Sequence, residues 1–524
     1  MDVVAISACV VVCAVFYAVA KLVNKLAIRD DASKFEGPPS LPLIGSAHLF
    51  IGGGEAILRR TREFEKLYCK PYRIFIGSQA YFVTSNPDQI KVILNSSKTI
   101  DKPDKFTDFF QPWLGSGLLT SPAPMWRVHR KLIQPTFSSN ILKSFLEIFA
   151  AKAVILVNRI ENHVDGPEFE VQKYFSLCTL DTICGTAMGV DLEAQTKGEC
   201  RYAEATRSVL RAICARAFQP WLHPNFIFYR TRLGKDHQEK IKFLHSFAEN
   251  VIQTKKRQIL ERTSRSGSVD DEYKDCDPTA HREIFLDRLV RLSRSNETLT
   301  DRAIREEVDT LILGGSNTMP IAMSFLMLML ASNQNIQHKV YEELYEIYGD
   351  EDDGELSITA ENLSRMVYLE RVIKETLRLF PVFPVIFRKV TEDLNLGERT
   401  LPKGSAAVIY IMGAHRSEEN WLDPLKFDPD RFLPEKFAEQ HPYSFIPFSG
   451  GPRNCIGFKY AMLFMKTLAA TLLRKYTFTK NKIVPVENVR IKLESELQPA
   501  EPITVGIKRR MQKTELTSDT SISP

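Results

Sequence analysis

The sequence lacks several features that would assign a chain of 524 residues to a special class. Its nine cysteines are scattered, odd in number and form no Cys-x-x-Cys pair. This pattern argues against a secreted disulfide framework and a zinc site, and it favours a reducing compartment. An excess of one charge is also missing, since 69 Lys and Arg face 64 Asp and Glu. A net charge of +5 is too small for a nucleic-acid footprint, so no nucleic-acid partner is expected.

What remains is the composition of a globular protein, with 44% hydrophobic and 25% charged residues and no internal repeat. Most long periodic segments favour helix, and residues 458–476 place apolar side chains at i, i+3 and i+4. Strand-like stretches are short, at 72–76, 80–84 and 406–411, with further pieces after residue 474. We therefore predict a mainly α fold, a large helical domain with small β-sheets.

The amino-terminal segment is apolar. Residues 3–20 carry no charge and are just long enough to cross about 30 Å of hydrocarbon. Lys21, Lys25 and Arg29 follow, which favours a retained membrane anchor with the rest of the chain on the cytoplasmic side. A cleaved signal peptide fits less well, because Asp2 stands where a basic residue is expected.

These patterns divide the chain into four parts. Residues 1–29 are the predicted anchor and its basic stop, and residues 30–45 are a proline-rich hinge in which helix cannot continue. Residues 46–510 are the predicted folded domain, and 511–524 a disordered tail. Inside the domain, residues 261–280 are polar and weakly patterned, which predicts a surface loop.

A second charge-free run, residues 310–332, is long enough to be another membrane span. It contains Gly314, Gly315 and Pro320, however, and it continues a charged amphipathic segment at 300–307. We predict a long helix through the centre of a soluble core, with the second membrane span as the alternative.

The most specific segment is Pro447-Phe448-Ser449-Gly450-Gly451-Pro452-Arg453-Asn454-Cys455-Ile456-Gly457. Its glycines are expected to remove side chains where a flat ligand would approach the backbone. Cys455 precedes a predicted helix, whose free N–H groups and positive dipole end favour the thiolate form. A thiolate held in this way can serve as a soft axial ligand to iron.

This segment resembles the haem-binding signature of the cytochrome P-450 superfamily, the haem-thiolate monooxygenases, because Phe448, Gly451, Cys455 and Gly457 occupy its fixed positions. Three further motifs stand in the order typical of this family. They are Trp126-x-x-x-Arg130, Glu375-x-x-Arg378 and Pro429-Asp430-Arg431-Phe432. The motifs look closest to the microsomal animal clan that contains the fatty-acid ω-hydroxylases. The resemblance implies that the domain is a helical haem-thiolate domain.

The resemblance also implies a cofactor, haem b (iron protoporphyrin IX), with Cys455 as the metal ligand. The residues that match cofactor-binding positions of the family are Cys455, Trp126, Arg130, Arg453, Arg388 and Phe448. The arginines would bind the haem propionates and the indole N–H would add a donor. Glu375 and Arg378, three apart on one helical face, are expected to form a buried ion pair that Arg431 completes, with a solvated pair as the alternative.

Oxygen chemistry is expected in residues 314–318, which resemble the oxygen-side motif of the family. Because Pro320 has no N–H, the carbonyl four residues earlier loses its helical partner, and the helix should open next to Gly315. Thr318 would hydrogen-bond the bound oxygen, whereas Asn317 replaces the usual acid and can orient a water but cannot titrate. A simple packing kink is the alternative. The predicted catalytic residues are thus Thr318, Asn317 and Cys455.

Gly314 occupies the position of a glutamate that is esterified to haem in some members of this clan. An ester link through that residue is therefore ruled out.

The implied activity is monooxygenation, in which reduced haem binds O2, the Cys455 thiolate aids O–O cleavage, and one oxygen atom enters a C–H bond. The chain has no nucleotide-binding Gly-x-Gly-x-x-Gly fingerprint, so electrons should come from NADPH through a separate membrane-bound P-450 reductase, with cytochrome b5 as a second candidate. An acidic partner could dock on a basic cluster near the thiolate side. Its residues are Lys459, Arg127, Lys131 and Arg453. The implied location is the endoplasmic reticulum membrane.

The substrate is expected to be lipophilic, such as a fatty acid, terpenoid, pheromone-like lipid or xenobiotic, because the candidate pocket walls are apolar. The walls are Phe106, Phe109, Phe110, Trp113, Leu313, Val382, Phe383, Val385 and Ile386. Two alternatives stay open: a haem-thiolate isomerase or dehydratase of oxygenated lipids, and a non-catalytic haem or lipid carrier.

Overall fold

The computed structural model describes residues 31–198, 201–266, 283–295, 299–349 and 358–510. The predicted anchor and the predicted tail lie outside these described residues, as does most of the predicted loop. Helix α12 (Arg232–Ser266) extends into the first residues of that predicted loop, where Glu261 and Arg262 are good helix formers.

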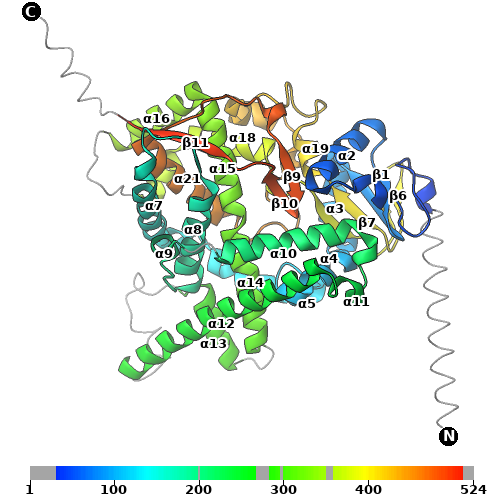
Figure 1. Ribbon diagram of the computed structural model, residues 1–524, viewed down its shortest axis with the longest axis horizontal. Helices are drawn as coiled ribbons and strands as arrows, with labels where there is room; N and C mark the ends of the chain where they lie inside the picture. The colour runs from blue at the N-terminus through cyan, green and yellow to red at the C-terminus, as the bar shows by residue number, and fades with distance from the viewer. Residues whose placement is uncertain (1–30, 199–200, 267–282, 296–298, 350–357, 511–524) are drawn as a thin grey trace, which may run out of the picture.

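Helices make up most of the molecule, as predicted, and five of them form its centre (Figure 1). These are α7 (Leu146–Ile160), α8 (Gln172–Ile183), α15 (Thr318–Ser332), α18 (Val367–Leu379) and α21 (Phe458–Lys475). Helix α21 confirms the helix predicted at 458–476, and it packs on α7, α15 and α18. Its buried face carries Phe464, Leu468 and Leu472, one turn apart, so the apolar stripe faces the core.

A second group of helices surrounds this centre. They are α2 (Gly53–Leu67), α3 (Pro87–Asn95), α4 (Asp104–Leu114), α5 (Ala123–Ile133), α10 (Arg201–Phe218), α13 (Phe285–Ser295) and α16 (Gln334–Tyr348). Helix α10 packs lengthwise on α12, and the two cross one face of the molecule (Figure 1). Short helices complete the connections. They are α6 (Ser139–Ser144), α9 (Ala194–Lys197), α11 (Asn225–Phe228), α17 (Ala360–Arg365), α19 (Ile411–His415) and α20 (Pro434–Ala438).

The sheets are small, as predicted. The largest has the order β1 (Tyr72–Ile76), β2 (Gln79–Thr84), β7 (Ala406–Ile409) and β4 (Ile386–Lys389). Strands β2 and β7 are parallel, with Tyr81 opposite Ala406, and β4 is antiparallel to β7, with Arg388 opposite Ala407. The other sheets are β3 (Phe169–Glu170), β11 (Thr504–Arg509) and β8 (Tyr476–Thr479); β10 (Glu496–Pro499) and β9 (Ile491–Glu494); and β5 (Leu394–Asn395) and β6 (Thr400–Leu401).

The charge-free run at 310–332 lies in the core. Helix α14 (Asp301–Ser316) and helix α15 follow each other along it, and 78% of the most apolar window in Asp301–Ser332 is buried. Both helices contact α8, which covers one side of them. The prediction of a central core helix is confirmed.

The proline-rich segment lies along strand β1. The backbone N–H of Arg73 donates to Glu36 O at 2.8 Å, and Ser46 N–H donates to Phe75 O at 2.6 Å. A β-bridge also joins Gly45 to Ile76. These bonds attach the segment to the edge of the main sheet.

Candidate active site

The loop that contains Cys455 runs directly into α21. Backbone hydrogen bonds fix it, with Cys455 N–H donating to Phe448 O at 3.0 Å and Asn454 N–H donating to Gly451 O at 3.2 Å. Gly451 has φ +67°, and a Cβ there would lie 2.0 Å from the carbonyl oxygen of Leu94 on α3. This glycine therefore allows the loop to pack on α3.

The thiol of Cys455 is surrounded by protein and yet keeps accessible surface, so it borders an internal space. Burial raises the pKa of the Cys455 thiol, and it outweighs the Gly457 N–H and the Arg130 guanidinium, which both lower it. The Gly457 N–H at the helix start and the Arg130 charge thus act in the predicted direction, toward the thiolate. Deprotonation requires a further positive charge, which a coordinated metal ion supplies.

Helix α5 presents its two motif residues to this loop. Arg130 Nη1 donates to Asn454 O at 2.8 Å, and Nη2 donates to Asn454 Oδ1 at 2.9 Å. Trp126, which is buried, lies under the Arg453 guanidinium, with 5.4 Å between its ring centroid and Cζ. The structure therefore brings three predicted cofactor-binding residues, Trp126, Arg130 and Arg453, together at the Cys455 loop.

Three cations meet in the interior next to the loop. Arg388, on β4, is 2% exposed, and its nearest polar partner outside its own strand is Ser449 Oγ at 3.4 Å. Burial and the neighbouring Arg453 lower the pKa of Arg388 to about 10. Burial, Arg388 and Arg453 also lower the pKa of Lys102 well below its usual value. Arg453 has Asp101 as an acidic neighbour and otherwise donates to backbone carbonyls of Ile100, Leu119 and Ser121.

This cluster fits a dianionic ligand. Like charges at close range in a protein interior repel one another, and the described residues supply one carboxylate for three cations. The two propionates of haem carry the charge that is missing, beside the thiol that would hold its iron. The residues present therefore fit haem, and Lys102 joins the predicted set.

Phe448 and Phe106 mark two edges of this region. Phe448 is partly buried, and its ring lies 6.3 Å from that of Phe458 at the start of α21. Phe106 lies 4.7 Å from Phe110 and 6.2 Å from Phe387, and the Lys102 ammonium lies 5.5 Å from its centroid. The predicted wall residue Phe106 thus lies beside the cation cluster, with Phe110 packed against it.

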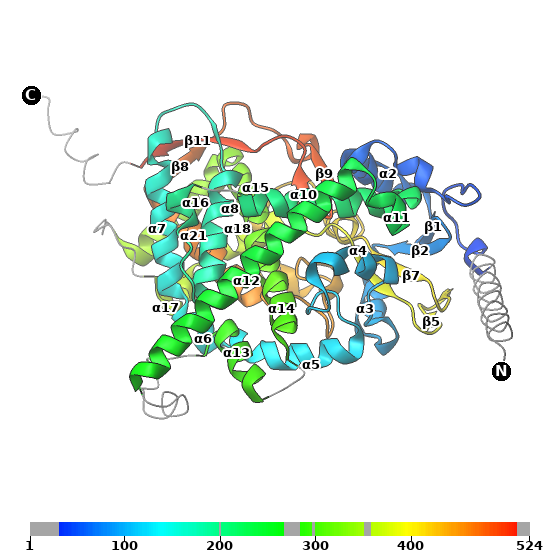
Figure 2. The same cartoon turned by 60° about the horizontal axis from the view of Figure 1, so that its bottom comes forward.

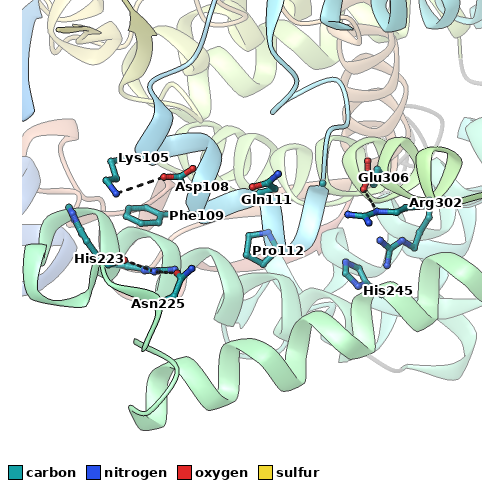
Figure 3. A pocket seen from close by; sticks show the side chains of 13 residues that line it. Lys105, Asp108, Phe109, Gln111, Pro112, His223, Asn225, His245, Arg302 and Glu306 are labelled. Carbon is teal, nitrogen blue, oxygen red and sulfur yellow. Dashed lines mark hydrogen bonds and ion pairs between the residues drawn. The ribbon is translucent and has the colours of Figure 1, made fainter. Parts of the chain in front are cut away.

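Other predicted wall residues lie elsewhere. Trp113 is 0% exposed. Phe109 lines a pocket of about 600 Å³ between α4, α10 and α14, where its ring faces His223 and Arg216 at 5.3 and 4.6 Å (Figure 3). Charged and polar side chains dominate that pocket, so its lining is unsuited to a lipophilic compound. Phe109, which is 4% exposed, therefore borders this polar pocket as well as the apolar core.

The Glu375 triad is formed as predicted. Glu375 and Arg378 are 0% exposed, and the guanidinium donates to both carboxylate oxygens at 2.7 and 2.8 Å. Arg431 approaches from a distant segment, with Nε 3.4 Å from Glu375 Oε1. Asp428 N–H donates to the same oxygen at 2.9 Å. The solvated-pair alternative is therefore excluded, and the triad joins α18 to the segment that leads to the Cys455 loop.

The central helix is interrupted where Pro320 predicts. Helix α14 ends at Ser316, α15 begins at Thr318, and the freed Ser316 carbonyl accepts a hydrogen bond from Thr179 Oγ1 at 2.9 Å. Thr318 Oγ1 donates to Gly314 O at 2.7 Å. Nothing in the sequence around Thr179, on α8, predicts this contact. Its hydroxyl replaces the hydrogen bond that proline removes.

The open side of this break is at Gly314, one residue before the expected position. A Cβ on Gly314 would meet nothing within 4 Å, although its helix is in the core, whereas a Cβ on Gly315 would lie 2.6 Å from Ile183 on α8. The expectation of a gap beside Gly315 is wrong, because that residue is needed for the close approach of α8. Space exists instead beside Gly314, on the turn that precedes Thr318.

Asn317 contacts a carboxyl group that sequence reasoning missed. Its Nδ2 donates to Glu496 Oε2 on strand β10, 179 positions along the chain. No local pattern connects the two residues. The hydrogen bonds and ion pairs described for this structure do not link this pair to the Cys455 loop.

Comparison with known proteins assigns the class of the chain. The family model for cytochrome P450 matches residues 35–506, and the chain belongs to the cytochrome P450 family. It is 37% identical to cytochrome P450 4c21 of Blattella germanica over 480 residues, which cover 91% of this chain and 93% of that protein. It is 35% identical to cytochrome P450 4V2 of Homo sapiens over 476 residues, 90% of this chain and 88% of the relative.

The chain is therefore a cytochrome P450 monooxygenase of the family-4 clan, a haem enzyme that needs O2 and a redox partner. The predictions of family, enzyme class and cofactor are confirmed.

Proposed function

We propose that this protein is a membrane-bound haem-thiolate monooxygenase that oxidises lipophilic compounds, with Cys455 as the residue that would hold the haem iron. The observation that carries the proposal is the cluster of buried cations beside the Cys455 loop, which a ligand with two carboxylates would neutralise. When bound, the haem supplies activation of dioxygen, and the thiolate donates electron density toward it.

The chain's own residues would hold that group in place. Arg388, Arg453 and Lys102 are proposed to bind the propionates, with the Trp126 indole N–H as a further donor. Arg130 fixes Asn454, the residue before Cys455, and so orients the loop from α5.

Thr318 and Asn317 are proposed to order water and to donate hydrogen bonds at the helix interruption, where the bound haem would supply dioxygen chemistry. The space beside Gly314 and the interruption before Thr318 support this role, since both leave room next to a hydroxyl donor. In the structure this hydroxyl donates back to Gly314 O, and rotation about χ1 would redirect it.

Thr318→Ala is expected to uncouple electron consumption from product formation, because it removes that donor. Product formed per NADPH should fall by about tenfold or more, with a matching rise in hydrogen peroxide release. Thr318→Ser is the matched control, since it keeps a hydroxyl and should keep most of the coupling. Equal coupling in the alanine variant and the parent would remove Thr318 from the mechanism.

A reductase is proposed to dock on the α5 side of the molecule, with cytochrome b5 as a second electron donor. Arg127 and Lys131, one turn apart on α5, and Lys459 at the start of α21 are exposed and suit an acidic partner. Figure 2 shows α5 along the lower edge of the molecule. Arg453 is removed from this predicted cluster, because its guanidinium donates to interior carbonyls.

The membrane face is proposed to lie near the proline-rich segment, with residues 1–29 as the anchor in the endoplasmic reticulum membrane. Leu43 is 90% exposed, and Trp221 and Phe226 are also exposed. Gly77 lies between these two regions, since a Cβ there would be 3.8 Å from both Leu43 O and Pro220 Cβ. Exposed apolar groups gathered in this way favour insertion into a lipid surface.

Product analysis tests the proposed function. The membrane-bound protein, supplied with NADPH reductase and O2, is incubated with fatty acids, terpenoids and xenobiotics, and products are identified by mass spectrometry. We expect one class to gain a single oxygen atom, in a reaction that needs both NADPH and O2. Turnover without NADPH would instead indicate an isomerase or dehydratase.

A further inference from the structure

A buried carboxyl group lies against the interruption of the central helix. The hairpin of β9 and β10 carries Glu496 to Asn317, whose side-chain amide donates to Glu496 Oε2. Two bonds fix the hairpin tip, with Ser495 Oγ donating to Leu210 O at 3.1 Å and Leu497 N–H donating to Val382 O at 2.8 Å. The contact therefore belongs to an ordered part of the fold.

Glu496 has no cation to neutralise it among the described residues. It is 2% exposed, and the charged groups nearest to it pair with one another. Glu494, opposite it in the hairpin, forms ion pairs with Arg211 of α10 at 3.4 Å and with Lys492 of β9 at 3.1 Å. Helix α15, which also packs on β10, contains no charged residue.

This environment differs from that of Glu375, which is equally buried but has two arginine partners. Burial raises the pKa of Glu496 to about 7, and the Asn317 amide lowers it only in part. A carboxyl group in this state exchanges a proton near neutral pH, whereas an ion-paired carboxylate does not.

We propose that Glu496 holds and delivers a proton next to Asn317 and Thr318, where the helix interruption itself carries an amide and no acid. It orients the Asn317 amide and passes its proton to a water held at the helix interruption. The proton is replaced from solvent at the hairpin tip, where Glu494 and Ser495 are partly exposed. No electron moves through Glu496, and the inference depends on the proposed oxygen-side role of Thr318 and Asn317.

The first test replaces the carboxyl group with its amide. Glu496→Gln keeps the size of the side chain and a hydrogen bond to Asn317, but it cannot titrate. In reductase-supplemented membranes, we expect product per NADPH to fall about tenfold, hydrogen peroxide to rise, and the pH dependence of coupling around pH 7 to disappear. Glu501→Gln is the control: Glu501 is exposed and pairs with Arg490 at 2.5 Å, so its replacement should leave coupling and its pH profile unchanged.

A rescue experiment separates proton transfer from a structural role. The double variant Asn317→Asp, Glu496→Gln returns an acid to the helix and keeps a donor on the hairpin, so coupling should recover most of the loss. A role limited to fixing the hairpin predicts no recovery. Absence of recovery, or normal coupling in Glu496→Gln, would overturn the proposal.

A measurement independent of turnover reads the proton directly. Infrared difference titration of the ferric holoenzyme between pH 5.5 and pH 8.5, a range of about three units around neutrality, should show a protonated carboxyl C=O band that titrates near pH 7 and is missing in Glu496→Gln. A parent enzyme without this band would also overturn the proposal.

Should Glu496→Gln fail to fold, Asn317→Ala removes the same hydrogen bond and leaves the hairpin sequence unchanged. Unchanged coupling in Asn317→Ala would overturn the proposal for Glu496. Thr318→Ala, run in parallel, keeps the outcomes distinct: uncoupling by that variant alone would leave the proposed function intact and remove only Glu496.

Discussion

Replacing Cys455 with serine is expected to abolish turnover and the spectral signature of thiolate ligation. The reduced enzyme with carbon monoxide should lose its strongly red-shifted Soret band, because a serine hydroxyl is neither soft nor readily deprotonated. Residual activity should lie at least about three orders of magnitude below that of the parent, a loss of about 4 kcal/mol in transition-state stabilisation.

Cys69→Ser is the control for this experiment. Cys69 is also a free cysteine, but it is exposed and follows α2, so its replacement should change neither the spectrum nor the activity. A normal red-shifted band in Cys455→Ser would contradict the assignment of the ligand.

The environment of Cys455 adds a second expectation to this result. Because burial raises the pKa of the thiol in the absence of a metal, the haem-free protein should carry a thiol at neutral pH and react slowly with alkylating reagents. Haem binding should then release a proton as the thiolate forms, which calorimetry in two buffers of different ionisation enthalpy would detect.

Replacing Arg378 with alanine is expected to give haem-free or misfolded protein. Its guanidinium is 0% exposed, donates to both oxygens of Glu375 and to His415 O, and lies 5.1 Å from the Trp421 ring. Burial raises the pKa of Glu375 despite these partners, so the carboxylate depends on them to stay charged. Removing Arg378 leaves a charge without its main partner, at a cost of about 3 to 5 kcal/mol.

Thermal unfolding and haem content per chain would measure this effect. Lys374→Ala is the control on the same helix: Lys374 pairs with Glu370 at 2.7 Å, but both side chains are about one-third exposed, at 34% and 37%. That pair should contribute about 0 to 1 kcal/mol. Normal haem content in Arg378→Ala would refute the structural role of the triad.

The local parts of the site could be predicted from sequence. Glu375 and Arg378 lie one helical turn apart, Cys455 immediately precedes α21, and Pro320 interrupts the helix four residues after Ser316. Each of these relations spans a few residues, where backbone geometry alone fixes which groups meet.

Two expectations failed for a common reason. Gly315 was expected to face a gap and Arg453 to belong to a docking cluster, whereas Ile183 and interior carbonyls decide otherwise. In each case the deciding neighbours come from other parts of the chain.

The sequence by itself determined the family and the haem cofactor, and it predicted a cysteine as the residue that would hold the iron, because short motifs carry those properties. Only the tertiary structure decided that Lys102 joins two arginines, that Thr179 satisfies the interrupted helix and that Glu496 meets Asn317. The physical reason is that burial and charge act through space, so a proton's affinity for a side chain depends on groups hundreds of residues away.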